Sequence, residues 1–203
     1  MTTSIIIPAR YGSSRYRGKP LVKILGREMV LRVADICKKI KNVKVFIATD
    51  SKKIANVAKK NGYDYIFTSS ACLTGTDRVA EASKKIRSKI YINVQGDEPT
   101  IDPSDIMKVI NAKKKFPHHV ICGYDKVHDF EKAESPNLPK VVVNSKGELI
   151  YISRALVPGS KKKNQKIQYH KQVCIYAFNK KQLEKFYSTK KKSDTESIED
   201  IEI

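Results

Sequence analysis

Residues 5–21 read IIIPARYGSSRYRGKPL, and this stretch decides the fold that we expect. The apolar run at its start predicts a buried strand, and the run stops abruptly at a loop rich in cations. The cations are Arg10, Arg15, Arg17 and Lys19. In open α/β sheets, ligands bind at the carboxyl ends of the strands, and Gly12 and Gly18 would let the backbone approach a ligand closely. The loop therefore predicts a phosphate site.

The loop differs from the common phosphate-binding motifs. Gly12 and Gly18 enclose five residues where a Walker loop has four, and Pro20 follows Lys19 where that motif has a metal-binding Ser or Thr. A GxGxxG pattern is also missing from the sequence. The alternative is a basic surface loop without a ligand, which mutual repulsion of the cations disfavours.

The chain continues with an alternation of apolar runs and amphipathic stretches. Strands are expected at residues 3–8, 43–48, 65–67, 90–94 and 120–124. Helices are expected at residues 28–40, 51–61, 76–85 and 103–114, and the helix at 51–61 is expected to be capped by Asp50 or Ser51. Strands that alternate with helices imply crossover connections, so we expect an α/β fold with a mostly parallel, Rossmann-like sheet and helices on both of its faces.

The pattern changes after Pro139. Residues 140–144 and 148–153 flank the turn residues 145–147 and predict an antiparallel hairpin, followed by a strand at 172–178 and a helix at 180–187. Ser193 and Glu196 resemble a capping box that opens a short last helix. Because no linker divides the chain, we expect residues 1–203 to form one domain in which residues 139–180 are the antiparallel segment.

The composition limits the class of protein. A formal charge of +19 invites a nucleic-acid interpretation, but the lysine runs lie at expected helix ends and in loops, and no nucleic-acid-binding motif accompanies them. We therefore expect no nucleic-acid partner, only a weak attraction to anionic substrates. The sequence lacks a membrane span and a signal peptide, which predicts a cytoplasmic protein without a membrane partner. Buried free thiols are expected at Cys37, Cys72, Cys122 and Cys174, which form no CxxC pair.

A second polar cluster, QGDEP at residues 95–99, follows the strand expected at 90–94. Asp97 is placed for a divalent cation, since Mg²⁺ takes one or two carboxylates and completes its shell with water and phosphate oxygens. The alternative is a turn that leads into the helix from Pro103, with Asp102 as its cap.

A third cluster, TGTDRVAEA at residues 74–82, opens a helix with Arg78 in its first turn. A cation there is disfavoured by the helix dipole, so Arg78 is expected to have a ligand or a carboxylate partner. Asp77 and Glu81 are the carboxylates nearest in sequence.

These stretches, together with ATD at 48–50, KVVVNSKGELIYISRALVP at 140–158 and IYAF at 175–178, resemble the 3-deoxy-manno-octulosonate (Kdo) cytidylyltransferases, also called CMP-Kdo synthetases. The resemblance covers nearly the whole chain. It implies a GT-A-type nucleotidyltransferase fold, a homodimer formed through the antiparallel segment, and Mg²⁺ as cofactor. The implied reaction transfers CMP from CTP to a 2-keto sugar acid and releases pyrophosphate, for lipopolysaccharide or surface-polysaccharide synthesis.

The resemblance also implies roles for single residues. The triphosphate would be held by Arg10, Arg15 and Lys19, assisted by Ser13 and Ser14. Ala9 and Arg78 would lie by the cytidine, Gln95 beside the reacting groups, and Asp97 on the magnesium. The sugar acid would contact Arg154, Gln172, Tyr176 and Glu199.

Three departures from the family pattern bear on function. Tyr16 and Arg17 replace a Leu-Pro pair, which should leave triphosphate binding intact. Gln172 and Cys174 stand where the family has His and Gly, and the His belongs to the family's sugar pocket, so the acceptor acid is expected to differ from Kdo. The family continues beyond the IEI ending to a segment resembling VDTPEDL that supplies a second metal carboxylate, so we expect the sequence to be a truncated or naturally short relative.

Other functions stay open at this point. A different ulosonate or a phosphonate is one alternative acceptor. A GT-A glycosyltransferase would consume a nucleotide sugar and normally carries a DxD signature, of which GDEP is a loose relative. An inactive binder of nucleotides or polyanions would fit the charge.

Overall fold

A computed structural model of the chain describes residues 2–12, 16–162, 165–189 and 191–201. The described residues divide into two compact units. Unit 1 comprises those of 1–121 and 174–190, and unit 2 those of 122–173 and 191–203. The expectation of one domain stays a prediction.

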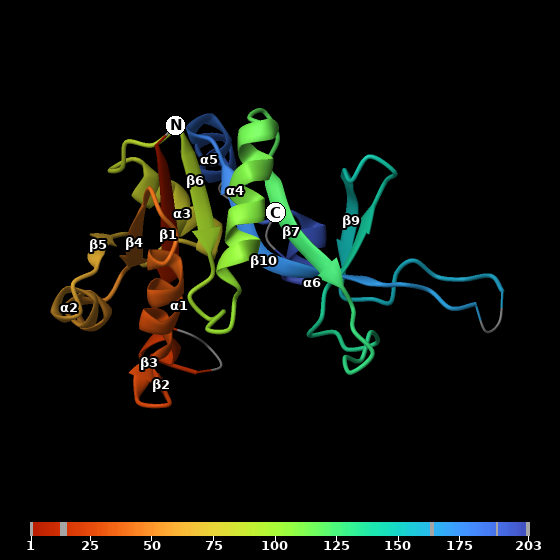
Figure 1. The fold of residues 1–203 in the computed structure, drawn as a ribbon, viewed down its shortest axis with the longest axis horizontal. Helices are drawn as coiled ribbons and strands as arrows, with labels where there is room; N and C mark the ends of the chain where they lie inside the picture. The colour runs from red at the N-terminus through yellow and green to blue at the C-terminus, as the bar shows by residue number, and fades with distance from the viewer. Residues whose placement is uncertain (1, 13–15, 163–164, 190, 202–203) are drawn as a thin grey trace. The chain divides into compact units, whose positions relative to one another are not determined.

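Unit 1 is built on a sheet in the order β5-β4-β1-β6-β10 (Figure 1). Its strands are β1 (Thr3–Ala9), β4 (Val43–Thr49), β5 (Asp64–Phe67), β6 (Ile90–Val94) and residues 174–178 of β10 (His170–Phe178). The first four run parallel, and β10 is antiparallel to β6 through the pairs Ile175–Val94 to Phe178–Tyr91. The mostly parallel, Rossmann-like sheet predicted from the sequence is confirmed.

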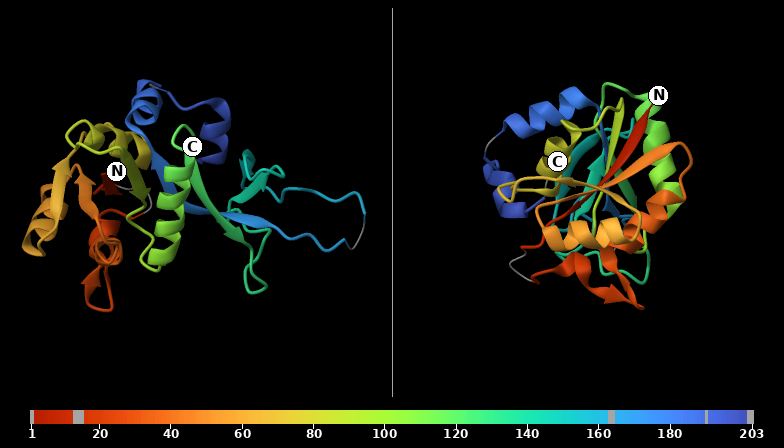
Figure 2. Two further views of the ribbon diagram at one scale, coloured as in Figure 1. Left: turned by 45° about the horizontal axis from the view of Figure 1, so that its top comes forward. Right: turned by 90° about the vertical axis from the view of Figure 1, so that its left-hand side faces the viewer.

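Five helices accompany this sheet in unit 1: α1 (Met29–Lys38), α2 (Lys52–Lys60), α3 (Gly75–Ser83), α4 (Pro103–Lys115) and α5 (Lys180–Ser188). α1 and α4 lie together on one face, α3 and α5 lie together on the other, and α2 packs on β4 and β5 (Figure 2). The sequence placed each helix within two residues of these ends, because each carries an apolar stripe at helical spacing.

The core of unit 1 is centred on β1. Every residue from Thr3 to Ala9 is buried, and the side chains of Ile5, Ile6 and Ile7 have no exposure to solvent. A strand that is covered on both faces needs apolar residues at consecutive positions rather than at alternate ones, which explains the run of isoleucines. The chain leaves this strand at Arg10, which is exposed.

A short hairpin between β1 and α1 was missed by the sequence analysis. β2 (Lys23–Ile24) pairs with β3 (Arg27–Glu28) across a turn in which Leu25 and Gly26 have positive φ angles of 49° and 79°. Strands of two residues are too short to show an alternating pattern, so only the glycine signals the turn. A 3₁₀ helix (η1, Lys19–Leu21) precedes the hairpin.

Unit 2 is mainly antiparallel, as predicted for this part of the chain. β8 (Lys140–Val143) pairs with β9 (Leu149–Ser153), and Lys140 also pairs with Lys171 at the start of β10. The connecting turn is held by Asn144, whose Oδ1 accepts hydrogen bonds from the amides of Lys146 and Glu148. β7 (Ile121–Lys126) pairs with β10 as well, and α6 (Asp194–Glu199) opens at Ser193, whose Oγ accepts from the Glu196 amide at 3.1 Å.

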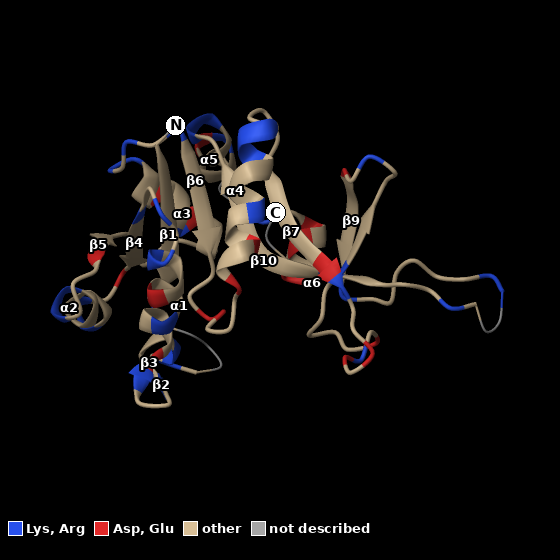
Figure 3. Cartoon of the chain, in the orientation of Figure 1, with Lys and Arg blue, Asp and Glu red and all other residues tan. Residues whose placement is uncertain are grey.

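Lysine and arginine positions are spread over several elements of both units (Figure 3). The last turns of α2 and α4 carry the runs Lys59–Lys60 and Lys113–Lys115. All four cysteines are free thiols, as expected. Cys37 is buried as predicted, whereas Cys72, Cys122 and Cys174 are only partly buried, which corrects the expectation for these three. Among the described residues, the helices are too short or too polar to cross a membrane.

Candidate active site

The parallel strands of unit 1 bring three loops to one edge of the sheet. β1, β4 and β6 are neighbours and run in the same direction, so the residues that follow Ala9, Thr49 and Val94 emerge side by side. Those residues are the basic loop from Arg10, the Asp50 turn and the QGDEP turn. This is the edge at which open α/β sheets bind ligands, as predicted.

The described part of the basic loop is closed by its own backbone. The Gly18 amide donates to the Tyr11 carbonyl at 2.8 Å, and Gly18 has a φ of 77°, which favours glycine. A β-carbon at Gly18 would also lie 3.3 Å from the Tyr11 ring. Arg17 and Lys53 lie over that ring at 5.6 and 5.2 Å from its centroid. The predicted residues Ser13, Ser14 and Arg15 lie outside the described residues.

The QGDEP turn packs directly against the end of β1. A β-carbon at Gly96 would lie 2.8 Å from the Pro8 carbonyl oxygen, so only glycine fits without a shift of the backbone. The Gln95 amide donates to the Cys174 carbonyl at 3.5 Å, which ties the turn to β10. This close packing sets the distance between the turn and the basic loop.

Lys19 and Asp97 meet across this gap. Lys19 Nζ lies 2.5 Å from Asp97 Oδ2, and the two side chains are 45% and 48% exposed. The adjacent carboxyl group, Glu98, is half-buried. Burial and the charge of Asp97 raise the pKa of Glu98. The structure thus brings together the two groups that the sequence assigned to phosphate and to metal.

The carboxylates of this edge suit a metal that shares its shell with a substrate. Among the described residues, no three His, Cys, Asp or Glu side chains are grouped so as to hold an ion by themselves. Asp97 offers one accessible carboxylate opposite a basic loop, which is the kind of protein contribution that Mg²⁺ accepts when phosphate oxygens and water supply the other ligands. The residues present therefore fit magnesium bound as a nucleotide complex.

Arg78 lies in α3 behind this edge and is only 2% exposed. Its Nη1 donates to Thr68 Oγ1 at 2.6 Å and its Nη2 to Asp50 Oδ2 at 3.2 Å. The carboxylate partner is thus Asp50, not the two carboxylates nearest in sequence. Asp77 instead closes a capping box with Thr74, and Glu81 accepts from the Ser69 amide.

Asp50 is a residue that the sequence analysis did not assign to the site. Its Oδ1 accepts from the Tyr11 amide at 3.1 Å while its Oδ2 faces Arg78. The sequence suggested Asp50 or Ser51 as the cap of the helix at 51–61. Ser51 occupies the N-cap position of α2 without a side-chain bond. The position of Asp50 after a parallel strand was the signal that could have found it.

Of the residues predicted to contact a sugar acid, three lie in unit 2. Arg154 donates to the carbonyls of Glu199, Pro136 and Asp200. The Glu199 carboxylate accepts from Ser153 Oγ at 2.7 Å, the Arg154 amide at 2.8 Å and Tyr151 Oη at 3.2 Å. These bonds hold the pKa of Glu199 below its usual value, chiefly through Ser153. Gln172 is half-buried, and its backbone amide donates to the Pro139 carbonyl at 2.9 Å.

Two further predicted residues are buried in the sheet of unit 1. Ala9 ends β1 and is 2% exposed, and Tyr176, at 3%, pairs with Asn93 across β10 and β6. The structure thus gathers Ala9, Arg10, Lys19, Gln95 and Asp97 at one sheet edge, and pairs Arg154 with Glu199 within unit 2.

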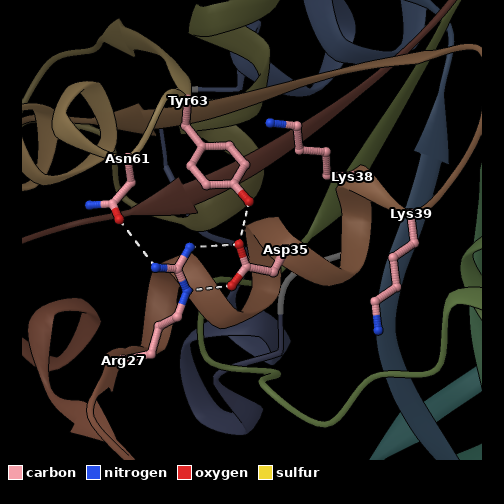
Figure 4. A pocket seen from close by; sticks show the side chains of 6 residues that line it. All are labelled: Arg27, Asp35, Lys38, Lys39, Asn61 and Tyr63. Atoms are coloured by element: carbon pink, nitrogen blue, oxygen red, sulfur yellow. Dashed lines mark hydrogen bonds and ion pairs between the residues drawn. The ribbon is translucent and has the colours of Figure 1, made fainter.

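An open pocket of about 400 Å³ lies elsewhere in unit 1, between α1 and the end of α2 (Figure 4). It is lined by Arg27, Asp35, Lys38, Lys39, Asn61 and Tyr63. Asp35 accepts two bonds from Arg27 and one from Tyr63, and Arg27 also donates to Asn61 at 3.1 Å. The polar centre of this pocket is paired within itself, and none of the predicted site residues lines it.

The comparisons with known proteins agree with this geometry. The family model described as Cytidylyltransferase matches residues 4–203. The 3-deoxy-manno-octulosonate cytidylyltransferase of Rickettsia felis is 39% identical over 206 residues, which cover 98% of this chain and 81% of that protein. The mitochondrial enzyme of the same name from Arabidopsis thaliana is 39% identical over 202 residues, covering 97% of this chain and 69% of that protein.

A solved structure has the same fold. It is described as CMP:2-keto-3-deoxy-manno-octonic acid synthetase complexed with CTP, with a TM-score of 0.90 and 35% identity, and the match covers 99% of this chain and 83% of that one. The sequence and the fold therefore lead to one conclusion: the chain belongs to the cytidylyltransferase family.

Proposed function

We propose that this nucleotidyltransferase transfers CMP from CTP to a 2-keto-3-deoxy sugar acid, Kdo or a related ulosonate, and releases pyrophosphate. The observation that carries the proposal is the match, over nearly the whole chain, to relatives named 3-deoxy-manno-octulosonate cytidylyltransferase at up to 39% identity. Activated sugars of this kind serve lipopolysaccharide or surface-polysaccharide synthesis, which we propose as the setting. The basic loop beside Asp97 supplies the chemistry that such a transfer needs.

On the nucleotide side, we propose that Arg10, Arg15 and Lys19 hold the triphosphate, with Ser13 and Ser14 assisting. Ala9 would lie by the cytidine and Gln95 by the reacting groups. Arg78 was predicted beside the cytidine as well. Its 2% exposure and its bonds to Asp50 and Thr68 favour a supporting role from behind the nucleotide.

Asp97 would hold Mg²⁺ together with phosphate oxygens of CTP and water. The ion, when bound, would neutralise charge on the transferring and leaving phosphates. Lys19 would then exchange its bond to Asp97 for one to phosphate. An exposed ion pair is worth little in water, so this exchange costs little free energy.

The reaction needs no covalent enzyme intermediate. The anomeric hydroxyl of the acid would attack the α-phosphorus of CTP, the bond from that phosphorus to the bridging oxygen would break, and pyrophosphate would leave. The residues of the chain contribute by orienting the triphosphate and by placing cations where charge accumulates.

The acceptor acid is assigned to Arg154, Gln172, Tyr176 and Glu199. Because Arg154 is a planar donor, it suits a carboxylate or paired oxygens. Gln172 stands where the family pattern has His, and this favours a second candidate function, transfer of CMP to an acid other than Kdo. An amide can donate and accept hydrogen bonds but does not titrate.

We further propose a cytoplasmic homodimer with no nucleic-acid or membrane partner. The spread of lysines and arginines over many elements supports the absence of a nucleic-acid partner, since nucleic-acid-binding proteins usually gather these residues on one face (Figure 3). Size-exclusion chromatography with light scattering, with and without duplex DNA or RNA, tests the oligomeric state and the absence of a nucleic-acid partner. A monomer would contradict the proposed homodimer. A complex with DNA or RNA at physiological salt would contradict the absence of a nucleic-acid partner.

The test of the main proposal is a pyrophosphate-release assay with CTP and Mg²⁺ against a panel of acids: Kdo, other ulosonates and a phosphonate. Mass spectrometry of the product identifies the CMP-sugar. Replacing CTP by ATP is the matched control and should give no release. Release only with another acid would select the second candidate. CTP binding without release for any acid would favour an inactive binder, and turnover of a nucleotide sugar would favour a glycosyltransferase.

A further inference from the structure

The carboxylate of Asp50 joins two parts of unit 1 that lie far apart in sequence. Oδ1 accepts from the Tyr11 amide at 3.1 Å, and Oδ2 accepts from Arg78 Nη2 at 3.2 Å. The Tyr11 carbonyl in turn accepts from the Gly18 amide at 2.8 Å. Both backbone polar groups of Tyr11 are therefore fixed, one by Asp50 and the other by the far end of the basic loop.

Asp50 is itself held firmly. It follows the last residue of β4, and the Thr49 carbonyl accepts from the Thr68 amide at 2.9 Å. Thr68 Oγ1 accepts from Arg78, and the Ser69 carbonyl lies 3.3 Å from the same guanidinium nitrogen. The side chains of Arg78 and Asp50 are only 3% and 14% exposed, so neither charge can be left alone at low cost.

The position of this ion pair suits it to a role in the loop rather than in the core alone. Arg10 immediately precedes Tyr11, and Lys19 immediately follows Gly18. Asp50 and the Tyr11–Gly18 bond thus fix the backbone of two residues. Each of these residues is the immediate neighbour of a cation assigned to the triphosphate. An ordered loop spares the ligand the entropy of ordering it, which raises affinity.

We propose that Asp50 is a positioning residue of the CTP site: with Arg78 behind it, it fixes the described ends of the basic loop, at Tyr11 and Gly18, before CTP arrives. This inference rests on the proposed function, because it takes CTP as the ligand of the loop. It adds a role for two residues that do not have to touch the nucleotide.

The experiment compares the wild type with Asp50→Asn and Asp50→Ala in equilibrium CTP binding, measured calorimetrically with Mg²⁺. Loss of the carboxylate should raise the Kd for CTP on the order of tenfold in Asp50→Ala. Asp50→Asn should raise the Kd for CTP by less, because the asparagine side chain keeps one oxygen as acceptor for the Tyr11 amide, although it turns an NH₂ donor toward Arg78. Steady-state kinetics should show a raised KM for CTP with kcat changed less than about threefold.

Asp35→Asn is the matched control. It breaks another Arg–Asp pair of unit 1, in which Asp35 bonds to Arg27 and Tyr63, two residues outside the basic loop. It should lower the free energy of unfolding while leaving the Kd for CTP unchanged. A change of affinity equal to that of Asp50→Ala would mean that general destabilisation explains both, and would overturn the inference.

Backbone hydrogen exchange on the wild type provides a readout that does not depend on a variant folding. Without CTP, the Tyr11 and Gly18 amides should already exchange slowly, and Asp50→Ala, which removes the acceptor of the Tyr11 amide, should speed both. Free exchange of these amides in the wild type would overturn the inference, as would tight CTP binding by Asp50→Ala. A wild type that fails to bind CTP would instead refute the proposed function, so the two failures are distinguishable.

Discussion

Lys19 Nζ and Asp97 Oδ2 lie 2.5 Å apart, although 78 residues separate them in the sequence. One comes from the loop after β1 and the other from the turn after β6. The charges of Lys19 and Asp97 neutralise each other at the place where, in the proposed complex, Lys19 would bind phosphate and Asp97 would bind the metal. Because both side chains are about half exposed, the pair contributes little to stability and is free to exchange partners on binding a ligand.

Replacing Lys19 by Ala should therefore weaken CTP binding without unfolding the protein. Loss of a cation that contacts phosphate typically costs about 1.5 to 3 kcal/mol, so we expect the KM for CTP to rise by roughly 10- to 100-fold. Steady-state kinetics with varied CTP measures this change. Lys23→Ala, on the neighbouring hairpin, is the control, and unchanged CTP kinetics in Lys19→Ala would contradict the phosphate assignment.

Asp97→Asn should abolish most of the response to magnesium. An amide oxygen is a weaker ligand than a carboxylate, so we expect a fall in kcat on the order of 100-fold and a higher Mg²⁺ requirement. A titration of activity with Mg²⁺ at saturating CTP tests this. Asp105→Asn changes a carboxylate that pairs with Lys108 on α4 and should behave as the wild type. A normal Mg²⁺ titration in Asp97→Asn would place the metal elsewhere.

Gly96→Ala should destabilise the protein. The added β-carbon would lie 2.8 Å from the Pro8 carbonyl oxygen, so either the turn or the end of β1 must move. Overpacking against backbone costs about 1 to 3 kcal/mol, and the shift would also separate Asp97 from the loop. Chemical denaturation gives the free energy of unfolding. Gly159→Ala meets no atom within 4 Å and should leave that free energy nearly unchanged; equal effects would count against the packing argument.

Lys113 is a buried lysine whose loss should be costly. Its side chain is enclosed, and Nζ donates to the carbonyls of Pro117 and His119 and, at 2.7 Å, to Gln182 Oε1 at the start of α5. Burial lowers the pKa of this amine to about 8. Lys113→Met removes all three bonds. The Pro117 carbonyl and Gln182 Oε1 each keep a bond from Asn179, whereas the His119 carbonyl loses its Lys113 donor. We expect a loss of about 1 to 3 kcal/mol in thermal or denaturant unfolding.

The adjacent Lys114 is exposed and provides the control for that experiment. Lys114→Met removes the same charge from the same turn of α4 without uncovering buried acceptors. Its free energy of unfolding should stay close to that of the wild type. If Lys113→Met also left the free energy of unfolding unchanged, the three hydrogen bonds of Lys113 would contribute nothing to stability.

Asp35 should contribute a pH-dependent part of the stability. Burial acts to raise the pKa of Asp35, but hydrogen bonds from Arg27 and Tyr63 outweigh it and hold the pKa below the ordinary 3.8. A carboxyl group with a depressed pKa in the folded state stabilises fully above its unfolded value and loses that contribution as the pH falls through the folded one.

The wild type should therefore exceed Asp35→Asn in free energy of unfolding by a constant amount between about pH 5 and 7. The difference should shrink below about pH 4, as the unfolded and then the folded carboxyl group takes up its proton. Urea denaturation of both proteins across this range measures it. A difference that does not depend on pH would show that the ionised form of Asp35 is not the stabilising one.

Much of the fold was predictable because its signals are local. The isoleucines of β1 and the apolar stripes of the helices report burial through spacing alone. Asp102 could be named as a cap, in the alternative interpretation of the QGDEP turn, because capping acts over two residues; its Oδ1 accepts from the Ser104 amide at 2.7 Å. The hairpin at Leu25–Gly26 was missed because two-residue strands have no period. The sequence predicts Asp50 or Ser51 as a helix cap, and it does not reveal the bonds of Asp50 to Tyr11 and Arg78 because these partners are 39 and 28 residues away.

By itself, the sequence determined the succession of strands and helices along the chain, the basic loop at the end of β1 and the membership in a family of cytidylyltransferases. Only the tertiary structure decided which charges meet: Lys19 with Asp97, Arg78 with Asp50, and Arg154 with the backbone around Glu199. The physical reason is that secondary structure follows from neighbours along the chain. Ion pairs between loops depend instead on which parallel strands lie side by side, and that order is fixed only when the sheet assembles around β1.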